Sequence, residues 1–193
     1  MTKLVYYVAI SLDGRICAPD GGFEAFPMTG DHLEAIQEDW ADTLPSVLYD
    51  RSGSTAPRER FATVLMGWNT YAAGLSMTDS PYSHLEQIVF SRSRTAADVG
   101  AGVTLTREDP RRVVAALKER GGGDVWLCGG GDLAGQLIAD IDRLVLKVNP
   151  VVFGDGRPLF AGEYDPTGFV LESSRTFQSG VLITEYARMR PPM

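Results

Sequence analysis

Residues 124–133, with the sequence DVWLCGGGDL, run from a short apolar segment into three consecutive glycines and then into a new helical pattern. This order predicts a strand, a tight turn and a helix. A turn without Cβ atoms lets another group approach the backbone, and the first turn of a helix offers unpaired N–H groups to an anion. The stretch suggests a site for a phosphate-bearing ligand, although glycines at such a position also serve simply to make a tight corner.

Two more strand-like segments end in polar or glycine-containing sequences. Residues 62–66 lead into Gly67-Trp68-Asn69-Thr70, and residues 87–90 lead into Ser91-Arg92-Ser93-Arg94. In a parallel α/β sheet all such ends lie along the carboxyl edge, where ligands bind. The spacing is not that of GxGxxG and no GxxxxGK[ST] sequence is present, so the dinucleotide-binding fingerprint and the P-loop are both excluded.

The first half of the chain predicts alternating strands and helices. Residues 4–10 form a nearly continuous apolar run, typical of a strand buried on both faces, and the Asp13-Gly14 pair predicts a turn after it. Asp31 is the predicted N-cap of an amphipathic helix that follows. Residues 50–57 are polar and predict a loop.

The second half changes character near residue 142. Residues 103–105 predict a strand, Asp109-Pro110 the start of a helix, and residues 133–141 a further helix. The segments 142–153, 169–172 and 181–188 are strand-like with no helix between them, and Pro150 predicts a bulge or an edge. We therefore expect one α/β domain over residues 1–193, a three-layer αβα fold whose mostly parallel central sheet carries antiparallel C-terminal strands.

Composition narrows the class of partner. The chain has 193 residues and a formal charge of −7, which argues against nucleic-acid binding because that binding depends on Lys and Arg. No apolar run approaches the ~20 residues that span a bilayer, and no signal peptide is recognisable, so we expect a cytoplasmic protein without membrane contact. The 2 cysteines and 2 histidines lack metal-ligand spacing, so no metal site is expected.

Five stretches, taken in order, resemble the dihydrofolate reductase superfamily. Within it the chain is similar to the reductase domain that forms the C-terminal half of the bacterial bifunctional riboflavin deaminase-reductase, and to its stand-alone relatives. The matching stretches are residues 11–16 (SLDGRI), 65–71 (LMGxxTY, where x is not matched), 89–93 (VFSRS), 125–133 (VWLCGGGDL) and 150–160 (PVVFGDGRPLF).

The resemblance implies a dihydrofolate reductase-like fold and NADPH as the hydride donor. It places the nicotinamide near Ala9 and the Asp13-Gly14 loop, the pyrophosphate over the two glycine corners, and the adenosine 2′-phosphate near Ser91 and Arg92. It also implies a cis peptide bond at Gly129-Gly130. The implied cofactor-binding residues are Ala9, Gly14, Gly67, Trp68, Asn69, Thr70, Ser91, Arg92, Gly129, Gly130, Gly131, Asp132 and Leu133.

One departure from the family concerns cofactor preference. The family usually has a basic residue directly after the glycine of the second corner, where this chain has Trp68 and Asn69. A Trp cannot form that ion pair, and it either stacks on adenine or fills a hydrophobic gap. Arg92 and Arg94 are the candidates to compensate, and the expected preference for NADPH over NADH is correspondingly weaker.

The proton donor is the least determined part of the chemistry. Asp13 matches a family motif and is the candidate catalytic residue, but it is equally an ordinary Asp-Gly turn residue, and a bound water could do the same work. The helix that faces substrate in dihydrofolate reductases carries acidic residues here, whose spacing prevents all from pointing inward. None is assigned as the folate-binding carboxylate; the set comprises Asp31, Glu34, Glu38 and Asp39.

The expected function is an NADPH-dependent reductase of a small heterocyclic or imine- or carbonyl-bearing metabolite. It is most like 5-amino-6-(5-phosphoribosylamino)uracil reductase of riboflavin biosynthesis, without the deaminase, whose zinc signature is absent. Genuine dihydrofolate reductase activity is one alternative, and a nucleotide-binding module without catalysis is another. The expected partner is a small-molecule substrate, and we expect a homodimer because relatives often pair.

Overall fold

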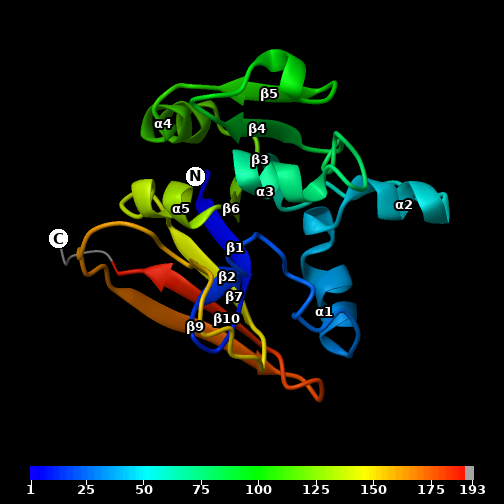
Figure 1. Ribbon diagram of the computed structural model, residues 1–193, viewed down its shortest axis with the longest axis vertical. Helices are drawn as coiled ribbons and strands as arrows, with labels where there is room; N and C mark the ends of the chain where they lie inside the picture. Colours follow the sequence, from blue (N-terminus) through cyan, green and yellow to red (C-terminus); the bar gives the residue numbers. More distant parts are fainter. Residues whose placement is uncertain (190–193) are drawn as a thin grey trace.

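A computed structural model describes residues 1–189, built around one eight-stranded sheet (Figure 1). The strand order is β5-β4-β3-β6-β1-β7-β10-β9. The first six of these strands run parallel, whereas β10 is antiparallel to both β7 and β9. The bounds are β1 Leu4–Ile10, β3 Phe61–Gly67, β4 Glu86–Phe90, β5 Val103–Thr106, β6 Asp124–Gly129, β7 Arg143–Val148, β9 Phe169–Thr176 and β10 Leu182–Arg188.

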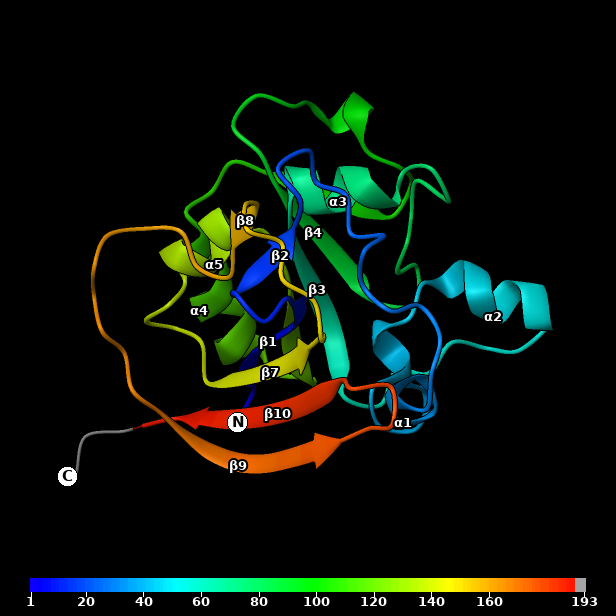
Figure 2. The ribbon, with the colours of Figure 1, turned by 60° about the horizontal axis from the view of Figure 1, so that its bottom comes forward.

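Helices cover both faces of the sheet, which gives the three layers expected. Helices α1 and α3 lie on one face and α4 and α5 on the other, while α2 projects from the body of the molecule (Figure 2). A two-stranded ribbon of β2 and β8 lies beside the loop after β1. The bounds are α1 His32–Asp39, η1 Ala41–Thr43, α2 Ser46–Ser52, α3 Trp68–Gly74, η2 Ala96–Asp98, α4 Pro110–Arg120, α5 Gly131–Gln136, β2 Arg15–Cys17 and β8 Arg157–Pro158.

Strand β1 contributes to both layers of the core, as its continuous apolar sequence predicts. Leu4 and Tyr6 pack in the cluster beneath α4 and α5, and Val5 and Tyr7 pack in the cluster beneath α1 and α3. All four side chains are at most 3% exposed. A strand in this position needs apolar residues at successive positions, because both of its faces are covered.

The order in which strands enter the sheet creates a switch point between β3 and β6. The chain runs outward from β3 through β4 to β5 and then returns to place β6 between β3 and β1. Helix α3, which follows β3, packs on one face, and α5, which follows β6, packs on the other. Connections that leave in opposite directions open a crevice at the carboxyl ends of the two strands, which is where open α/β sheets bind ligands.

Two element boundaries differ from the sequence predictions. The helix expected over residues 133–141 ends at Gln136, and the chain continues in turns that still bury Leu137 and Ile141 completely. The helical spacing of these apolar residues therefore reflects their burial in the core, and the helix itself does not continue through them. The loop expected over residues 50–57 begins late, because α2 runs to Ser52 and ends at Gly53, whose φ of 68° suits a helix C-terminus.

Two residues have other roles than those predicted. Pro150 forms neither a bulge nor an edge, because the central strand β7 ends at Val148 and Asn149 bonds the carbonyl of Ile10 through both its backbone and its side-chain amide. Asp31 occupies the N-cap of α1 but makes no capping bond. Its carboxylate accepts the backbone N–H groups of Gln178 and Ser179 in the β9–β10 turn, and so ties α1 to that hairpin.

None of the helices within residues 1–189 combines the length and apolar character that crossing a bilayer requires.

Candidate functional site

Two helices begin at the switch point with no side-chain cap. Gly67 is the N-cap of α3 and Gly130 is the N-cap of α5, and neither helix start has a side-chain hydrogen bond. The two corners touch, since a Cβ built on Gly130 would lie 3.9 Å from Gly67 Cα and 3.7 Å from Thr70 Oγ1. The first-turn N–H groups of both helices are thus available to a ligand at one place.

The glycine corner at the end of β6 reverses direction without a cis peptide. All peptide bonds in the described part of the chain are trans, so the cis bond expected at Gly129-Gly130 is wrong. The turn is made instead by positive φ angles of 150° at Gly129 and 93° at Gly130. Such angles are accessible to glycine at no steric cost, whereas a cis bond outside proline costs about 3 kcal/mol.

A groove of about 1000 Å³ runs along the ends of β3, β4, β5 and β6. It joins the three strand ends that the sequence singled out, because the glycine corners and the residues after β4 all line it. A volume of this size suits a nucleotide cofactor. Of the predicted cofactor residues, the groove is lined by Gly67, Trp68, Asn69, Thr70, Ser91, Arg92, Gly130, Asp132 and Leu133.

One side of this groove was not predicted from the sequence. Residues 106–111, at the end of β5 and the start of α4, also line it. Like the other three strand ends, residues 106–111 form a polar stretch between a strand and a helix. The rule that ligands bind at the carboxyl ends of parallel strands would therefore have predicted them. The other unpredicted lining residues are Phe90, Gln136, Ala161 and Gly162.

Three of the six charged side chains that line the groove are bonded within the protein. Asp109 caps α4 by accepting the N–H of Arg111, whose Nε donates to Gln136 O at 3.0 Å. Arg107 donates to Arg94 O at 3.0 Å. Arg92, by contrast, is exposed and forms no ion pair with any side chain of residues 1–189, so its guanidinium is available to an anion.

The neighbouring Arg94 lies over Trp68. Its guanidinium carbon is 4.5 Å from the centroid of the indole ring. Trp68 is half-buried and also packs against Tyr71, with 5.6 Å between ring centroids. At Trp68, where the resemblance implied a basic residue, the guanidinium of Arg94 stacks on the indole and places a positive charge at this corner.

Gly131 and Gly135 have a packing role on α5. A Cβ on Gly131 would lie 2.2 Å from Pro158 O, and one on Gly135 would lie 1.7 Å from Ala161 O. Ala161 N also donates to Gly131 O at 3.0 Å. The segment 157–162, which we call the strap, therefore lies directly on α5, and Gly131 is outside the groove lining although Gly130 is within it.

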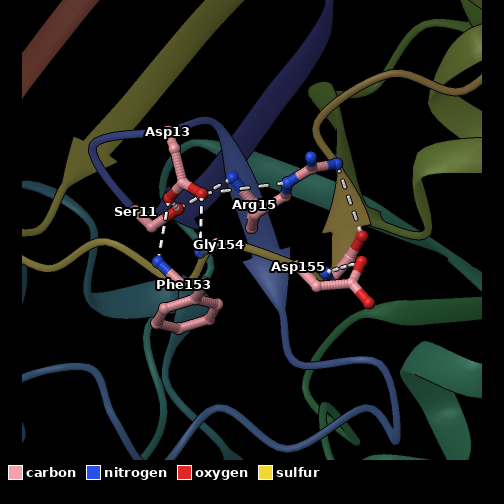
Figure 3. A network of polar contacts seen from close by, with 7 residues as sticks. Ser11, Asp13, Arg15, Phe153, Gly154 and Asp155 are labelled. Carbon is pink, nitrogen blue, oxygen red and sulfur yellow. Dashed lines mark hydrogen bonds and ion pairs between the residues drawn. The ribbon is translucent and has the colours of Figure 1, made fainter.

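Asp13 ties two loops together at the end of β1 (Figure 3). Its carboxylate accepts the Ser11 hydroxyl at 2.6 Å and the backbone N–H groups of Phe153 and Gly154 at 3.0 and 2.9 Å. These bonds, that of Ser11 first, lower the pKa of Asp13 to about 2. An ionised carboxylate with its acceptors engaged is suited to hold a loop in place and poorly suited to donate a proton.

Gly14 and Ala9 lie outside the groove lining but close to this loop. Gly14 has a φ of 74°, and its carbonyl accepts the N–H of Leu159 from the strap. Ala9 is half-buried on β1 beside Lys147 of β7. Gly129 is buried at the end of β6, next to the groove.

The acidic residues of the first helix all face away from the sheet or are already bonded. Asp31 accepts the two hairpin N–H groups, and Asp39 forms an ion pair with Arg175. Glu34 and Glu38 are exposed. This region of α1 thus presents apolar side chains, such as Ile36, to the sheet.

A nicotinamide dinucleotide fits the groove on chemical grounds. Its pyrophosphate needs N–H donors, which the two uncapped helix starts supply, and a further phosphate needs a free cation, which Arg92 supplies. Gly130 leaves the floor of the groove without a Cβ.

Comparison with solved structures supports this architecture. A putative riboflavin biosynthesis protein from Shewanella sp. PV-4 is 25% identical, with a TM-score of 0.72 over 98% of this chain and 100% of the other. The deaminase/5-amino-6-(5-phosphoribosylamino)uracil reductase from Thermotoga maritima has a TM-score of 0.63 at 14% identity, over 97% of this chain and 57% of the other. At 14% identity, the similarity to the Thermotoga maritima protein shows a shared fold alone.

Sequence comparison identifies the family. The uncharacterized protein YwjB from Bacillus subtilis is 29% identical over 93% of this chain and 94% of its own length. The model of the RibD C-terminal domain family matches residues 2–183. With its dihydrofolate reductase-like sheet and its groove at the switch point, the chain belongs to the RibD C-terminal domain family, as the resemblance in its motifs predicted.

Proposed function

We propose that the protein is an NADPH-dependent reductase of a small heterocyclic or imine- or carbonyl-bearing metabolite, most like 5-amino-6-(5-phosphoribosylamino)uracil. The observation that carries this proposal is the groove at the switch point, where two uncapped helix starts and the free Arg92 converge. Membership of the RibD C-terminal domain family supports it independently. The reduced nicotinamide supplies a hydride when bound.

The residues of the groove would share the work of holding the cofactor. The first turns of α3 and α5 would bind the pyrophosphate, and Ser91 and Arg92 the 2′-phosphate. The Asp13 carboxylate would keep the loop after β1 beside Ala9, where the nicotinamide is expected. The overall charge of −7 makes these local donors more important, because the protein as a whole does not attract an anion.

Two glycines offer a matched test of the groove. Gly130 has a φ of 93° and lines the groove, whereas Gly122 has a φ of 96° and is exposed with nothing within 4 Å of an added Cβ. Gly130→Ala and Gly122→Ala therefore impose the same kind of backbone strain. We expect only Gly130→Ala to weaken NADPH binding, by about tenfold or more, measured by isothermal titration calorimetry.

The reaction is tested by NADPH oxidation with two acceptors. We expect turnover with 5-amino-6-(5-phosphoribosylamino)uracil and none with dihydrofolate. Turnover with dihydrofolate alone would make the protein a dihydrofolate reductase, and tight NADPH binding without turnover of either would leave a nucleotide-binding module. The proposal is overturned if neither NADPH nor NADH binds.

A further inference from the structure

Lys147 stands beside Ala9 at the carboxyl edge of the sheet. It is the penultimate residue of β7, and its Cα pairs with that of Ala9 on β1 and that of Ile183 on β10. Its side chain lies on the face covered by α1, as that of Tyr7 does, since the Lys147 Nζ is 4.7 Å from the centroid of the Tyr7 ring. Strand β1, which carries Ala9, lies between β7 and β6 in the sheet.

The Lys147 amine has no partner of opposite charge within residues 1–189. Its Nζ forms neither an ion pair nor a hydrogen bond with these residues, and it lies over the Tyr7 ring. Burial lowers its pKa to about 8, partly offset by the neighbouring Cys128. A half-buried cation without a carboxylate costs stability, and an apolar side chain would pack there more favourably.

The acids on the elements near Lys147 are bonded to other residues. On β10, Glu185 lies 3.5 Å from Arg143, and on α1, Asp39 pairs with Arg175 of β9.

The other titratable groups near Lys147 are neutral at pH 8. Burial raises the pKa of Cys128 on β6 to about 12, and it raises the pKa of Tyr7 on β1 above its usual range. No neighbouring acid or thiol therefore neutralises the ammonium, which leaves it available to a ligand.

We propose that the Lys147 ammonium binds the heteroatom of the substrate's C=N or C=O acceptor group over Ala9 and donates a proton to it during reduction. This inference rests on the proposed reductase function. Asp13 is ionised and tied to two loops, and the acids of α1 are bonded or exposed, so Lys147 is the group of this region placed to give a proton.

The proposed step balances in protons and electrons. The bound dihydronicotinamide would supply a hydride, which consists of one proton and two electrons, to the acceptor carbon. The π electrons of the double bond pass to the heteroatom, and the Nζ–H bond breaks as the new N–H or O–H bond forms. The neutral amine then regains a proton from solvent, and a pKa near the working pH suits a group that cycles in this way.

The first test needs no cofactor. The chain contains three lysines, Lys3, Lys118 and Lys147, so selective ¹³C labelling of lysine gives three Cε signals, and Lys147→Met identifies one of them. We expect this signal alone to titrate near pH 8 and to shift when 5-amino-6-(5-phosphoribosylamino)uracil is added without NADPH. A signal that titrates near pH 10 and does not move with the bound compound overturns the proposal.

The second test separates proton donation from packing. We expect Lys147→Met to lower kcat by about 100-fold or more while the KM for NADPH stays within threefold, and Lys3→Met, at the exposed N-terminus, to leave both unchanged. The ammonium is present below pH 8, so wild-type kcat should fall above that pH. Lys147→Arg should retain substrate binding and lose this fall, because a guanidinium stays protonated.

The outcomes distinguish the two proposals. If the wild type turns the compound over and Lys147→Met remains within threefold of it at every pH, the role of Lys147 is wrong and the reductase function stands. If the wild type binds NADPH but does not turn the compound over, the reductase proposal fails for this substrate and the acceptor role of Lys147 fails with it.

Discussion

The carboxyl edge of the sheet has two halves that are built by different kinds of contact. The proposed cofactor half is the groove at the ends of β3 to β6. It is formed by two glycines, two helix starts without side-chain caps, and Arg92, which has no ion pair within residues 1–189. The proposed acceptor half comprises Ala9, Lys147 and the loop held by Asp13, which contacts between distant parts of the chain bring together. Asp13 bonds residues 140 and 141 positions away. Residues whose role follows from local turn and helix signals can be predicted from sequence, whereas residues that only tertiary contacts bring together cannot.

The strap couples the two halves, and its contact with α5 should be the most sensitive point. Gly135→Ala places a Cβ 1.7 Å from Ala161 O, which is backbone and cannot turn away. We expect a loss of about 2–3 kcal/mol in the free energy of unfolding, measured by urea denaturation. Gly74→Ala, at the end of α3 with 3.6 Å to the nearest atom, is the control and should change little. Equal stability of the two variants would show that the strap does not rest on α5.

Charge in the cofactor half gives the next largest effect. Arg92→Ala should raise the Kd for NADPH about tenfold and leave that for NADH within twofold, because the guanidinium is assigned to the 2′-phosphate. Calorimetry with both cofactors measures this difference. Arg51→Ala, on the last turn of α2, removes the same charge away from the groove and should change neither Kd. Equal losses for both cofactors would place Arg92 on the pyrophosphate instead.

Asp13→Asn tests the long-range contacts of the acceptor half. The folded-state pKa is lowered to about 2, so the ionised carboxylate stabilises the fold above pH ~4, and this contribution is lost as the pH falls toward 2. We expect the variant to melt below the wild type at pH 7 and the two melting curves to converge near pH 2. Asp165→Asn, in an exposed loop, should follow the wild type at every pH. A difference that persists near pH 2 would mean that the carboxylate is not the cause.

Local rules were enough to predict most of the fold from sequence. The alternating strands and helices follow from period and turn chemistry, and the three strand ends then had to meet because parallel strands share one edge. The same rule, applied to the end of β5, would have added residues 106–111. Gly131 was assigned to the cofactor because a glycine triplet does not reveal which of its members meets a ligand and which meets the strap.

The acceptor half could not be predicted in this way. In the sequence, Lys147 is a single charged residue in an apolar run. Its proposed role depends on its position beside Ala9, which follows from the pairing of β7 with β1. Asp31 had the sequence signature of an N-cap, yet its carboxylate bonds a turn 147 residues away. The β9–β10 turn competes successfully for this carboxylate because it offers two N–H groups at once. Which N–H groups the Asp31 carboxylate binds therefore depends on the tertiary structure, and local sequence propensity does not predict it.

The smallest effect concerns the stack of Arg94 on Trp68. An exposed cation–π contact contributes about 0.5–1 kcal/mol, so Arg94→Ala should lower the free energy of unfolding by no more than that. The guanidinium already covers an indole face, and an adenine would have to displace it to stack there. We therefore expect NADPH affinity to change less than threefold in Arg94→Ala, whereas a tenfold loss would show that Arg94 compensates directly for the missing basic residue. A gain in affinity would show instead that the uncovered Trp68 ring takes the adenine, and calorimetry on this single variant separates the three results.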